Sequence, residues 1–305
     1  MNLAAGAAAV YAAGIARTSF LRACELDVAV RKPGNVSRFS SGHGMQAAVF
    51  DASARASAEP LLRRGARVGE RIEAAVAATW AVAGCNTNLG ILLLCAPVAR
   101  AFEQCPDPAN RAALRAALET VLSDLDVADA RAAYRAIARA RPGGLGTAPA
   151  EDVHAVPSID LRAAMALAAD RDSIARQYRD GYAELFELGV PPLAGVLLDA
   201  PAGAGDTPAP ALAAAVQRVF LAFLARFPDS HIVRKHGPAV AHTVMCSAQP
   251  WQARARAGVD LDADPGFAAW DLELKEAGLN PGTSADLTVA ALFIAGLLDA
   301  TGAAH

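Results

Sequence analysis

Charged and amide side chains gather in five polar segments of a chain that is otherwise rich in alanine and leucine. The cations are Lys32, Arg38, Arg176, Arg234 and Lys235, the amides are Asn35, Asn86, Asn88 and Asn280, and the carboxylates are Asp27, Asp172, Asp229 and Asp286. Cations bind phosphate oxygens through charge-assisted hydrogen bonds, and carboxylates hold Mg²⁺ directly or through water. A polyphosphate with its metal requires this mixture of side chains.

The familiar phosphate-binding loops are absent. The sequence contains neither GxxxxGK[ST] nor a GxGxxG that is followed by a strand–helix unit. Turns that carry glycine, such as RKPGN and NTNLG, could instead let the backbone approach a ligand closely. A nucleotide would therefore be bound in some other way, and the elements that carry the polar segments decide how.

Those elements are predicted to be helices, because apolar residues recur with helical spacing along the whole chain. The predicted helices span residues 3–30, 66–83, 91–102, 111–125, 128–140, 161–188, 211–227, 266–277 and 285–300. Long alternating runs are absent and aromatic residues make up only 6% of the chain, so no substantial sheet is expected. We predict an all-α fold: a single large bundle-like domain over 1–305, with the active site in the polar interhelical loops and a flexible loop at about 200–210.

Composition limits the classes of protein to which the chain can belong. A formal charge of -3 over 305 residues gives no support for nucleic-acid or polybasic membrane binding. The five cysteines form no CxxC pair, which favours a reduced cytoplasm. The apolar N-terminus lacks a basic region and is predicted to be a buried first helix rather than a signal peptide. No segment reaches the roughly eighteen strongly apolar residues that a membrane span requires.

Each polar segment also has a purely structural interpretation. KPGN is typical of a turn, and TSAD fits a capping box that would make Asp286 a helix cap. GCNTNLG fits a helix C-cap followed by asparagines that bind the backbone, and DSHIVRKHG fits a helix end with its cations near the negative pole. Asp172, Arg176 and Arg179 have the spacing of a solvated ion-pair stripe. The chemistry that the segments share favours one common site.

Six motifs in order resemble the triphosphoribosyl-dephospho-coenzyme A synthase family. They are KPGNV at Lys32, NTNLG at Asn86, RPGGLG at Arg141, RDSIARQY at Arg171, DSHIVRKHG at Asp229 and LNPGTSADL at Leu279. The resemblance runs from about residue 23 to 298. It implies a helical transferase that joins the ribose C1 of ATP to the 2′-hydroxyl of dephospho-coenzyme A and releases adenine. Such a site must hold the triphosphate, support the departing base and deprotonate the acceptor hydroxyl.

The chain departs from the family pattern at two motifs. Asn88 and Leu89 replace a His-Lys pair, and SSGHGM lacks the acidic residue that follows the loop histidine in the synthases. The KPGNV, NTNLG and PGGLG motifs resemble those of a divergent branch of this family, which is found in methanogens and in methylotrophs that use tetrahydromethanopterin. That likeness implies an alternative acceptor, the arylribitol of a tetrahydromethanopterin cofactor, with either ATP or phosphoribosyl diphosphate as donor. The sequence leaves acceptor and donor open.

The resemblance assigns roles to the polar residues. Lys32, Arg234 and Lys235 are expected to bind phosphates, Asn35, Asn86, Asn88, Asn280 and Arg176 to bind or orient the nucleotide, and Asp27, Asp172 and Asp286 to hold Mg²⁺. Asp27, one and a half helical turns before Lys32, is also a candidate base, as is Asp172. His43 is a candidate acid toward adenine, and a loop histidine facing solvent is the alternative.

Two other classes of protein remain open. One is a non-catalytic helical nucleotide-binding protein, which the altered Asn88–Leu89 pair favours, and the other is a helical interaction protein. The expected partners are a small-molecule nucleotide donor and a hydroxyl acceptor, with no nucleic acid and no membrane; a homodimer is compatible with the sequence. The sequence does not decide whether the NTNLG motif supports activity.

Overall fold

The structure is a computed structural model that describes residues 3–40, 45–196 and 207–302, with side chains described from residue 10 onward. Within these ranges the chain is helical, and its one β-type contact is an isolated bridge between Ser37 and Ser40. The predicted all-α fold is confirmed. The helices are α1 Leu3–Ala29, α2 Ala47–Leu61, α3 Val68–Ala83, α4 Leu89–Gln104, α5 Arg111–Ser123, α6 Val127–Ala140, α7 Leu161–Ala166, α8 Ser173–Arg179, α9 Pro210–Leu224, α10 Ser230–His236, α11 Pro238–Arg256, α12 Pro265–Glu276 and α13 Gly282–Gly302, with the short turns η1 Leu185–Gly189 and η2 Pro191–Leu193.

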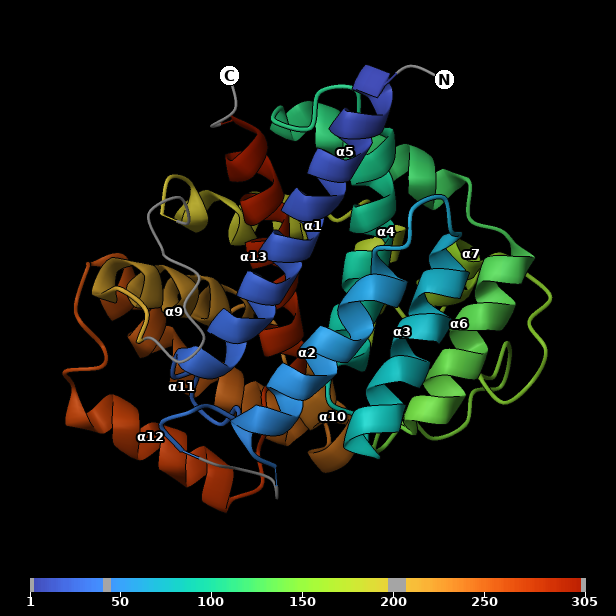
Figure 1. The fold of residues 1–305 in the computed structure, drawn as a ribbon. Coiled ribbons are helices and arrows are strands. Elements are labelled where there is room, and N and C mark those ends of the chain that lie inside the picture. The colour runs from blue at the N-terminus through green and yellow to red at the C-terminus, as the bar shows by residue number, and fades with distance from the viewer. Residues whose placement is uncertain (1–2, 41–44, 197–206, 303–305) are drawn as a thin grey trace.

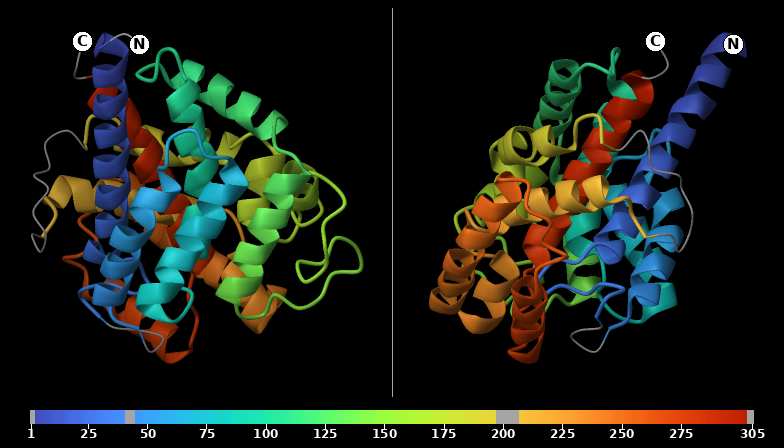
Figure 2. Two further views of the ribbon diagram at one scale, coloured as in Figure 1. Left: turned by 45° about the vertical axis from the view of Figure 1, so that its right-hand side comes forward. Right: turned by 90° about the vertical axis from the view of Figure 1, so that its left-hand side faces the viewer.

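The bundle is organised around α13, which packs against α1, α4 and α9. Helix α1 also contacts α2, and α2, α3 and α6 follow one another across the bundle. Both ends of the chain lie at the top of Figure 1, whereas the end of α1, the end of α3 and the start of α13 lie at the opposite end. The turned views in Figure 2 show the same arrangement. The topology therefore gathers the RKPGN, NTNLG and LNPGTS loops at one end of the bundle.

Helix α13 is the centre of the core. Phe293 is fully buried and meets Phe20 of α1 edge to face, with ring centroids 5.9 Å apart. Within the described residues, α13 is the one helix whose length and composition would suit a membrane span, although the sequence pattern had suggested none. In this structure 67% of its apolar window is buried inside the protein, which is what the core helix of a folded bundle requires.

Three departures from the predicted helices have local causes. Helix α2 is rich in Ala and Ser, and α11 contains Pro250, so neither has a strong apolar period. The predicted helix over 161–188 is divided into α7, α8 and η1. Asp172 restarts the helix as an N-cap, and Gly181 and Tyr182, with φ of 61° and 58°, end it. A polar cap inside an apolar pattern was the signal for this division.

Tyr178 completes the hydrogen bonding of α4. Pro97 lies inside α4 and has no N–H, so the carbonyl of Leu93, four residues earlier, loses its helical donor. The buried Tyr178 hydroxyl donates to this carbonyl at 2.6 Å. Burial also raises the pKa of Tyr178, which keeps the hydroxyl protonated.

Tyr178→Phe should therefore lower the free energy of unfolding by about 1–3 kcal/mol, because it leaves a buried carbonyl unpaired. Urea unfolding measures the change. Tyr182→Phe is the matched control: its hydroxyl donates at 3.0 Å to the carbonyl of Leu94, which the N–H of Val98 can also reach. Equal losses in the two variants would contradict the role given to Pro97.

Candidate functional site

The KPGN loop is a tight turn that packs on the LNPG loop. The N–H of Asn35 donates to the Lys32 carbonyl at 2.9 Å, and Gly34 has a φ of 79°, as a type II turn requires. A Cβ on Gly34 would lie 2.7 Å from the Leu279 carbonyl oxygen, so only glycine fits. Beside it, Asn35 Nδ2 donates to Asn280 Oδ1 at 3.0 Å. The turn interpretation is confirmed, and the structure brings these two predicted site residues together.

Asp271 of α12 anchors this turn, and the sequence pattern did not reveal it. Its buried carboxylate accepts hydrogen bonds from the Gly34 N–H at 2.9 Å and the Ser40 hydroxyl at 2.8 Å. The Lys275 ammonium lies 2.9 Å from the same carboxylate. Asp271 and the KPGN turn are more than 200 residues apart in sequence, so no local pattern could have paired them.

Lys32 is an internal residue. Its side chain is fully buried, its Nζ lies 2.9 Å from Asp27 Oδ1, and it also donates to the backbone carbonyl of Asp27 near the end of α1. Asp27 is itself only 5% exposed. The ammonium thus compensates a buried carboxylate and a helix C-terminus. In this structure Lys32 therefore serves as a counter-charge for Asp27. A direct contact between Lys32 and phosphate stays a prediction.

Asp286 of α13 is a carboxyl that lies near other acidic side chains. It lies in α13 four residues after the helix begins, so it is not the cap of a TSAD capping box, and that interpretation is wrong. The structure shows no hydrogen bond or ion pair to Asp286 from the residues that it describes. Burial raises its pKa well above the ordinary value, and the negative charges of Asp27, Asp229 and Asp172 raise it further against the opposing effect of Arg234.

The start of α4 is fitted around this carboxyl. Gly90 is the second residue of α4, and a Cβ there would lie 2.6 Å from Asp286 Cγ and 2.7 Å from Ile174 Cδ1 of α8. A side chain at position 90 would displace the Asp286 and Ile174 side chains from their present positions. The glycine of NTNLG is therefore explained by the neighbouring carboxyl.

Asp172 joins α8 to α10. Its Oδ1 caps α8 by accepting from the N–H groups of Ile174 and Ala175 at 2.9 and 3.1 Å, and its Oδ2 pairs with Arg234 Nη1 at 2.7 Å. Both carboxylate oxygens are thus engaged. The Nε of Arg234 is buried and has no hydrogen-bond partner among the described residues.

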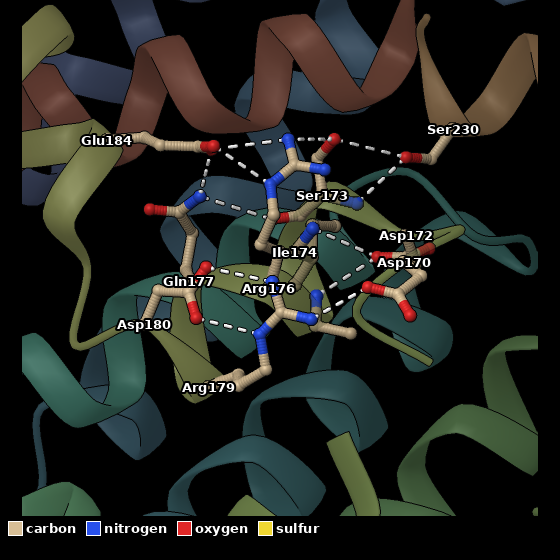
Figure 3. A network of polar contacts seen from close by, with 11 residues as sticks. Asp170, Asp172, Ser173, Ile174, Arg176, Gln177, Arg179, Asp180, Glu184 and Ser230 are labelled. Carbon is tan, nitrogen blue, oxygen red and sulfur yellow. Dashed lines mark hydrogen bonds and ion pairs between the residues drawn. The ribbon is translucent and has the colours of Figure 1, made fainter. Parts of the chain in front are cut away.

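Arg176 is held by other parts of its own segment. Figure 3 shows its guanidinium between Glu184 and Ser173, with Nε 2.9 Å from Glu184 Oε1 and Nη2 3.0 Å from Ser173 Oγ. It also stacks on Phe227, 4.4 Å from the ring centroid. Arg179 pairs with Asp170 and Asp180 instead of Asp172. The expected Asp172–Arg176 ion-pair stripe is therefore absent, and a nucleotide contact by Arg176 stays a prediction.

The asparagines of NTNLG serve the backbone and the core. Gly84 ends α3 with a φ of 65°, and Asn86 Oδ1 accepts from the Leu89 N–H at 3.1 Å, as the structural interpretation predicted. Asn88 is 5% exposed and bonds to Thr79 and Ser57. Asn88 thus has both ends of its amide engaged, whereas only the oxygen of Asn86 is used, so a nucleotide contact by Asn86 stays a prediction.

The RPGGLG loop lies against the end of α10. A Cβ on Gly144 would lie 2.8 Å from the Arg234 carbonyl carbon, and one on Gly143 would lie 2.9 Å from Lys235 Cε. Lys235 is exposed in the last turn of α10, as the helix-end interpretation predicted. Arg38, in contrast, lies 3.5 Å from Asp51 on the exposed side of the first loop.

A comparison with models of known protein families identifies the family of this chain. A model described as ATP:dephospho-CoA triphosphoribosyl transferase matches residues 14–304, almost the whole length. The chain belongs to this family. The six ordered motifs that suggested it therefore lie in a true member, and transferase chemistry is supported at the level of the family.

A solved structure supports the same fold. A proposed triphosphoribosyl-dephospho-CoA synthase from Archaeoglobus fulgidus is similar to this chain with a TM-score of 0.57 and 22% identity, over 82% of this chain and 98% of that one. At this identity the likeness concerns the fold alone. A search of curated proteins finds no significant match.

Two histidines of this transferase-family chain need comment. His43 lies outside the described residues. His231, which the sequence interpretation passed over, stands two residues after Asp229, and its Nδ1 would lie 3.3 Å from a Cβ on Gly282 at the start of α13. The DSHIVRKHG motif, which carries this histidine beside its cations, is the sequence signal for it.

The predicted Mg²⁺ ion requires oxygen ligands from the carboxylates of this region. Among the described residues, no group of three or more His, Cys, Asp or Glu side chains is arranged to hold a metal ion. Mg²⁺ is commonly held by only one or two carboxylates together with substrate phosphates. Asp172 has both oxygens engaged and Asp27 Oδ1 pairs with Lys32, so the second oxygen of Asp27 and the carboxyl of Asp286 are what the predicted set would offer to such an ion. Magnesium stays a prediction.

Proposed function

We propose that this chain transfers the 5-triphosphoribosyl group of ATP to an acceptor hydroxyl and releases adenine. Membership of the transferase family supports the reaction class. The observation that carries the proposal is Asp286, a carboxyl of raised pKa where the starts of α4 and α13 meet, with no partner among the described residues. In the reaction the bond between C1 of ribose and adenine breaks, and a bond from C1 to the acceptor oxygen forms.

Asp286 is the group that would take the acceptor proton. A base works best when its pKa lies near the working pH, and burial together with three neighbouring carboxylates moves the pKa of Asp286 in that direction. Glycosyl transfer passes through an oxocarbenium-like centre, which nearby negative charge stabilises. Asp27, close enough to act electrostatically on Asp286, would contribute to this stabilisation.

The triphosphate would lie toward the positive elements of the same end of the bundle. Arg234 is partly exposed beside its partner Asp172, and Lys235 extends from the exposed end of α10. The N-termini of α4 and α13 add partial positive charge. A Mg²⁺ ion bound with the triphosphate would be held by Asp27 and would supply further charge compensation for the phosphates.

The favoured acceptor is dephospho-coenzyme A, which the description of the family names. One observation favours a second acceptor, an arylribitol. Asn88 and Leu89 stand where a His-Lys pair is expected, and both are buried, with 5% and 7% exposure. These positions therefore present no cationic side chain to an acceptor carrying phosphates, whereas an uncharged polyol has no need of one.

Adenine release tests the proposal. Incubation of the protein with ATP, Mg²⁺ and dephospho-coenzyme A should release free adenine, one for each molecule of acceptor consumed, measured by chromatography. An arylribitol as acceptor and phosphoribosyl diphosphate as donor form the parallel arms. Adenine with the arylribitol alone would assign the second acceptor, and diphosphate release would assign the other donor. Binding of ATP without any product in all arms would contradict catalysis and favour a nucleotide-binding protein; no thermal shift with ATP would favour an interaction protein.

A further inference from the structure

The loop over residues 34–40 is fastened to α12 by a buried ion pair. Asp271 and Lys275 lie one turn apart on this helix, their side chains are 2% and 6% exposed, and Lys275 Nζ lies 2.9 Å from Asp271 Oδ1. The carboxylate accepts from the Gly34 N–H at 2.9 Å and from the Ser40 hydroxyl at 2.8 Å, and Lys275 Nζ donates to the Ser40 carbonyl at 3.3 Å. The pair therefore holds this loop at both of its ends.

The ion pair fixes the position of the turn more than it stabilises the fold. Taking two charges out of water offsets much of their attraction, so a buried pair adds little net stability. The turn cannot shift on α12, however, without leaving the carboxylate short of a donor. On its other side the turn meets the LNPG loop, since a Cβ on Gly34 would lie 2.7 Å from the Leu279 carbonyl oxygen and 2.8 Å from Pro281 Cδ. The KPGN turn is thus clamped between two segments.

The clamped turn carries Asn35, which pairs with Asn280 through its Nδ2 at 3.0 Å. Among the described residues, none donates a hydrogen bond to Asn35 Oδ1 and none accepts one from Asn280 Nδ2. Asn280 Oδ1 and His231 Nδ1 lie 3.7 and 3.3 Å from the same point, a Cβ on Gly282, so this amide pair adjoins the start of α13. An amide oxygen beside an amide N–H suits the uncharged, hydrogen-bonding edge of a base or a ribose diol.

We propose that Asp271 is a positioning residue for the nucleoside part of the donor. Through the Gly34 N–H it fixes the turn that presents Asn35, and with it the Asn35–Asn280 pair, to the base and ribose of ATP. The inference rests on the proposed function, in which ATP binds at this end of the bundle. Asp271 itself does not touch the nucleotide, because its two oxygens are occupied by the loop and by Lys275.

Loss of the anchor should weaken binding of the nucleoside and spare binding of the phosphates. Asp271→Ala/Lys275→Met removes the carboxylate together with the ammonium that it compensates, so no buried charge is left alone. The Kd and the KM of ATP should rise about 10-fold, because binding must then order the turn, whereas kcat should change little. The Kd of inorganic tripolyphosphate, which has neither base nor ribose, should stay within about twofold of the wild type.

Three further variants separate positioning from stability. Asp271→Asn/Lys275→Met keeps an oxygen that can accept from the Gly34 N–H, so it should recover most of the lost affinity for ATP. Ser40→Ala leaves the ion pair intact and loosens only the far end of the loop, so it should raise the Kd of ATP by a smaller factor, and it secures the test if the alanine variant at 271 does not fold. Asp264→Ala is the matched control: it removes the N-cap of α12 and should cost stability without changing either Kd.

Coupling to Asn35 decides whether Asp271 acts through it. In an Asn35→Ala background, Asp271→Ala/Lys275→Met should weaken ATP binding no further, because the side chain that the turn presents is already missing. Calorimetric titration of ATP and of tripolyphosphate measures every Kd without turnover. Additive losses, equal losses for the two ligands, or an unchanged Kd of ATP would each overturn the inference.

The inference and the proposed function can fail separately. Weaker ATP binding in the Asp271 variants of a protein that releases no adenine with any acceptor would overturn the proposed reaction and support the positioning role. Normal adenine release with an unchanged KM for ATP in the same variants would overturn the positioning role and leave the reaction in place. A wild type that binds no ATP would overturn both.

Discussion

Asp286→Asn should lower the rate of adenine release by about 10²- to 10⁴-fold and should at the same time make the folded protein more stable above neutral pH. The loss of rate follows from the proposed role, since an amide cannot take the acceptor proton. The gain in stability follows from burial and from the repulsion of Asp27, Asp229 and Asp172, which all disfavour the charged form of Asp286.

The pH dependence of the stability gain has a definite sign. The pKa of Asp286 is higher in the folded than in the unfolded chain, so the folded state binds the proton more tightly. The charge therefore destabilises the folded protein increasingly as pH rises from the ordinary carboxyl range through the raised pKa. The difference in melting temperature between Asp286→Asn and wild type should grow over this window and should shrink toward zero in acid.

A matched control lies on the same helix. Burial also raises the pKa of Asp299, which is 13 residues farther along α13, away from the polar loops. Asp299→Asn should give a stability gain of the same sign with unchanged adenine release. A variant at 286 that is stabilised and still fully active would remove Asp286 from the chemistry. One that is destabilised would contradict the raised pKa.

The helical fold could be predicted from the sequence because its signals are local. Apolar spacing located α1, α3, α4, α5, α6, α9, α12 and α13 to within a few residues at most ends. The helices that escaped prediction, such as α2, are held by their neighbours more than by a period of their own. A pairing such as Gly34 with Asp271 depends on packing between distant segments, so no local pattern could supply it.

The sequence identified the site region better than the roles of its members. The polar loops do converge at one end of the bundle, and Asn35 meets Asn280. Residue types alone, however, cannot tell a cation that awaits a ligand from one that is already paired. Lys32 and Arg176 are both paired internally, and Asn88 is used in the core. Conversely, the decisive feature of Asp286 is that it has no partner among the described residues, which only the folded arrangement reveals.

Lys32→Met should destabilise the protein by about 3–5 kcal/mol, because it leaves the Asp27 carboxylate buried without its compensating charge. The ammonium is fully buried, lies 2.9 Å from Asp27 Oδ1 and also binds the Asp27 carbonyl. Methionine preserves much of the side-chain volume, so the loss reports mainly on charge. Urea unfolding at neutral pH measures the change.

The double variant Lys32→Met/Asp27→Asn gives the decisive comparison. Replacement of both members of a buried ion pair is often nearly neutral, so the double variant should recover most of the stability that the single variant loses. Lys235→Met, at an exposed lysine of the same site, should stay within about 0.5 kcal/mol of the wild type. If Lys32 were instead a cation held ready for phosphate, Lys32→Met would fold as stably as the wild type and would lose affinity for ATP, and Asp27→Asn would restore nothing. The two outcomes separate a buried counter-charge from a ligand contact, because only the counter-charge makes the two positions depend on each other before any nucleotide binds.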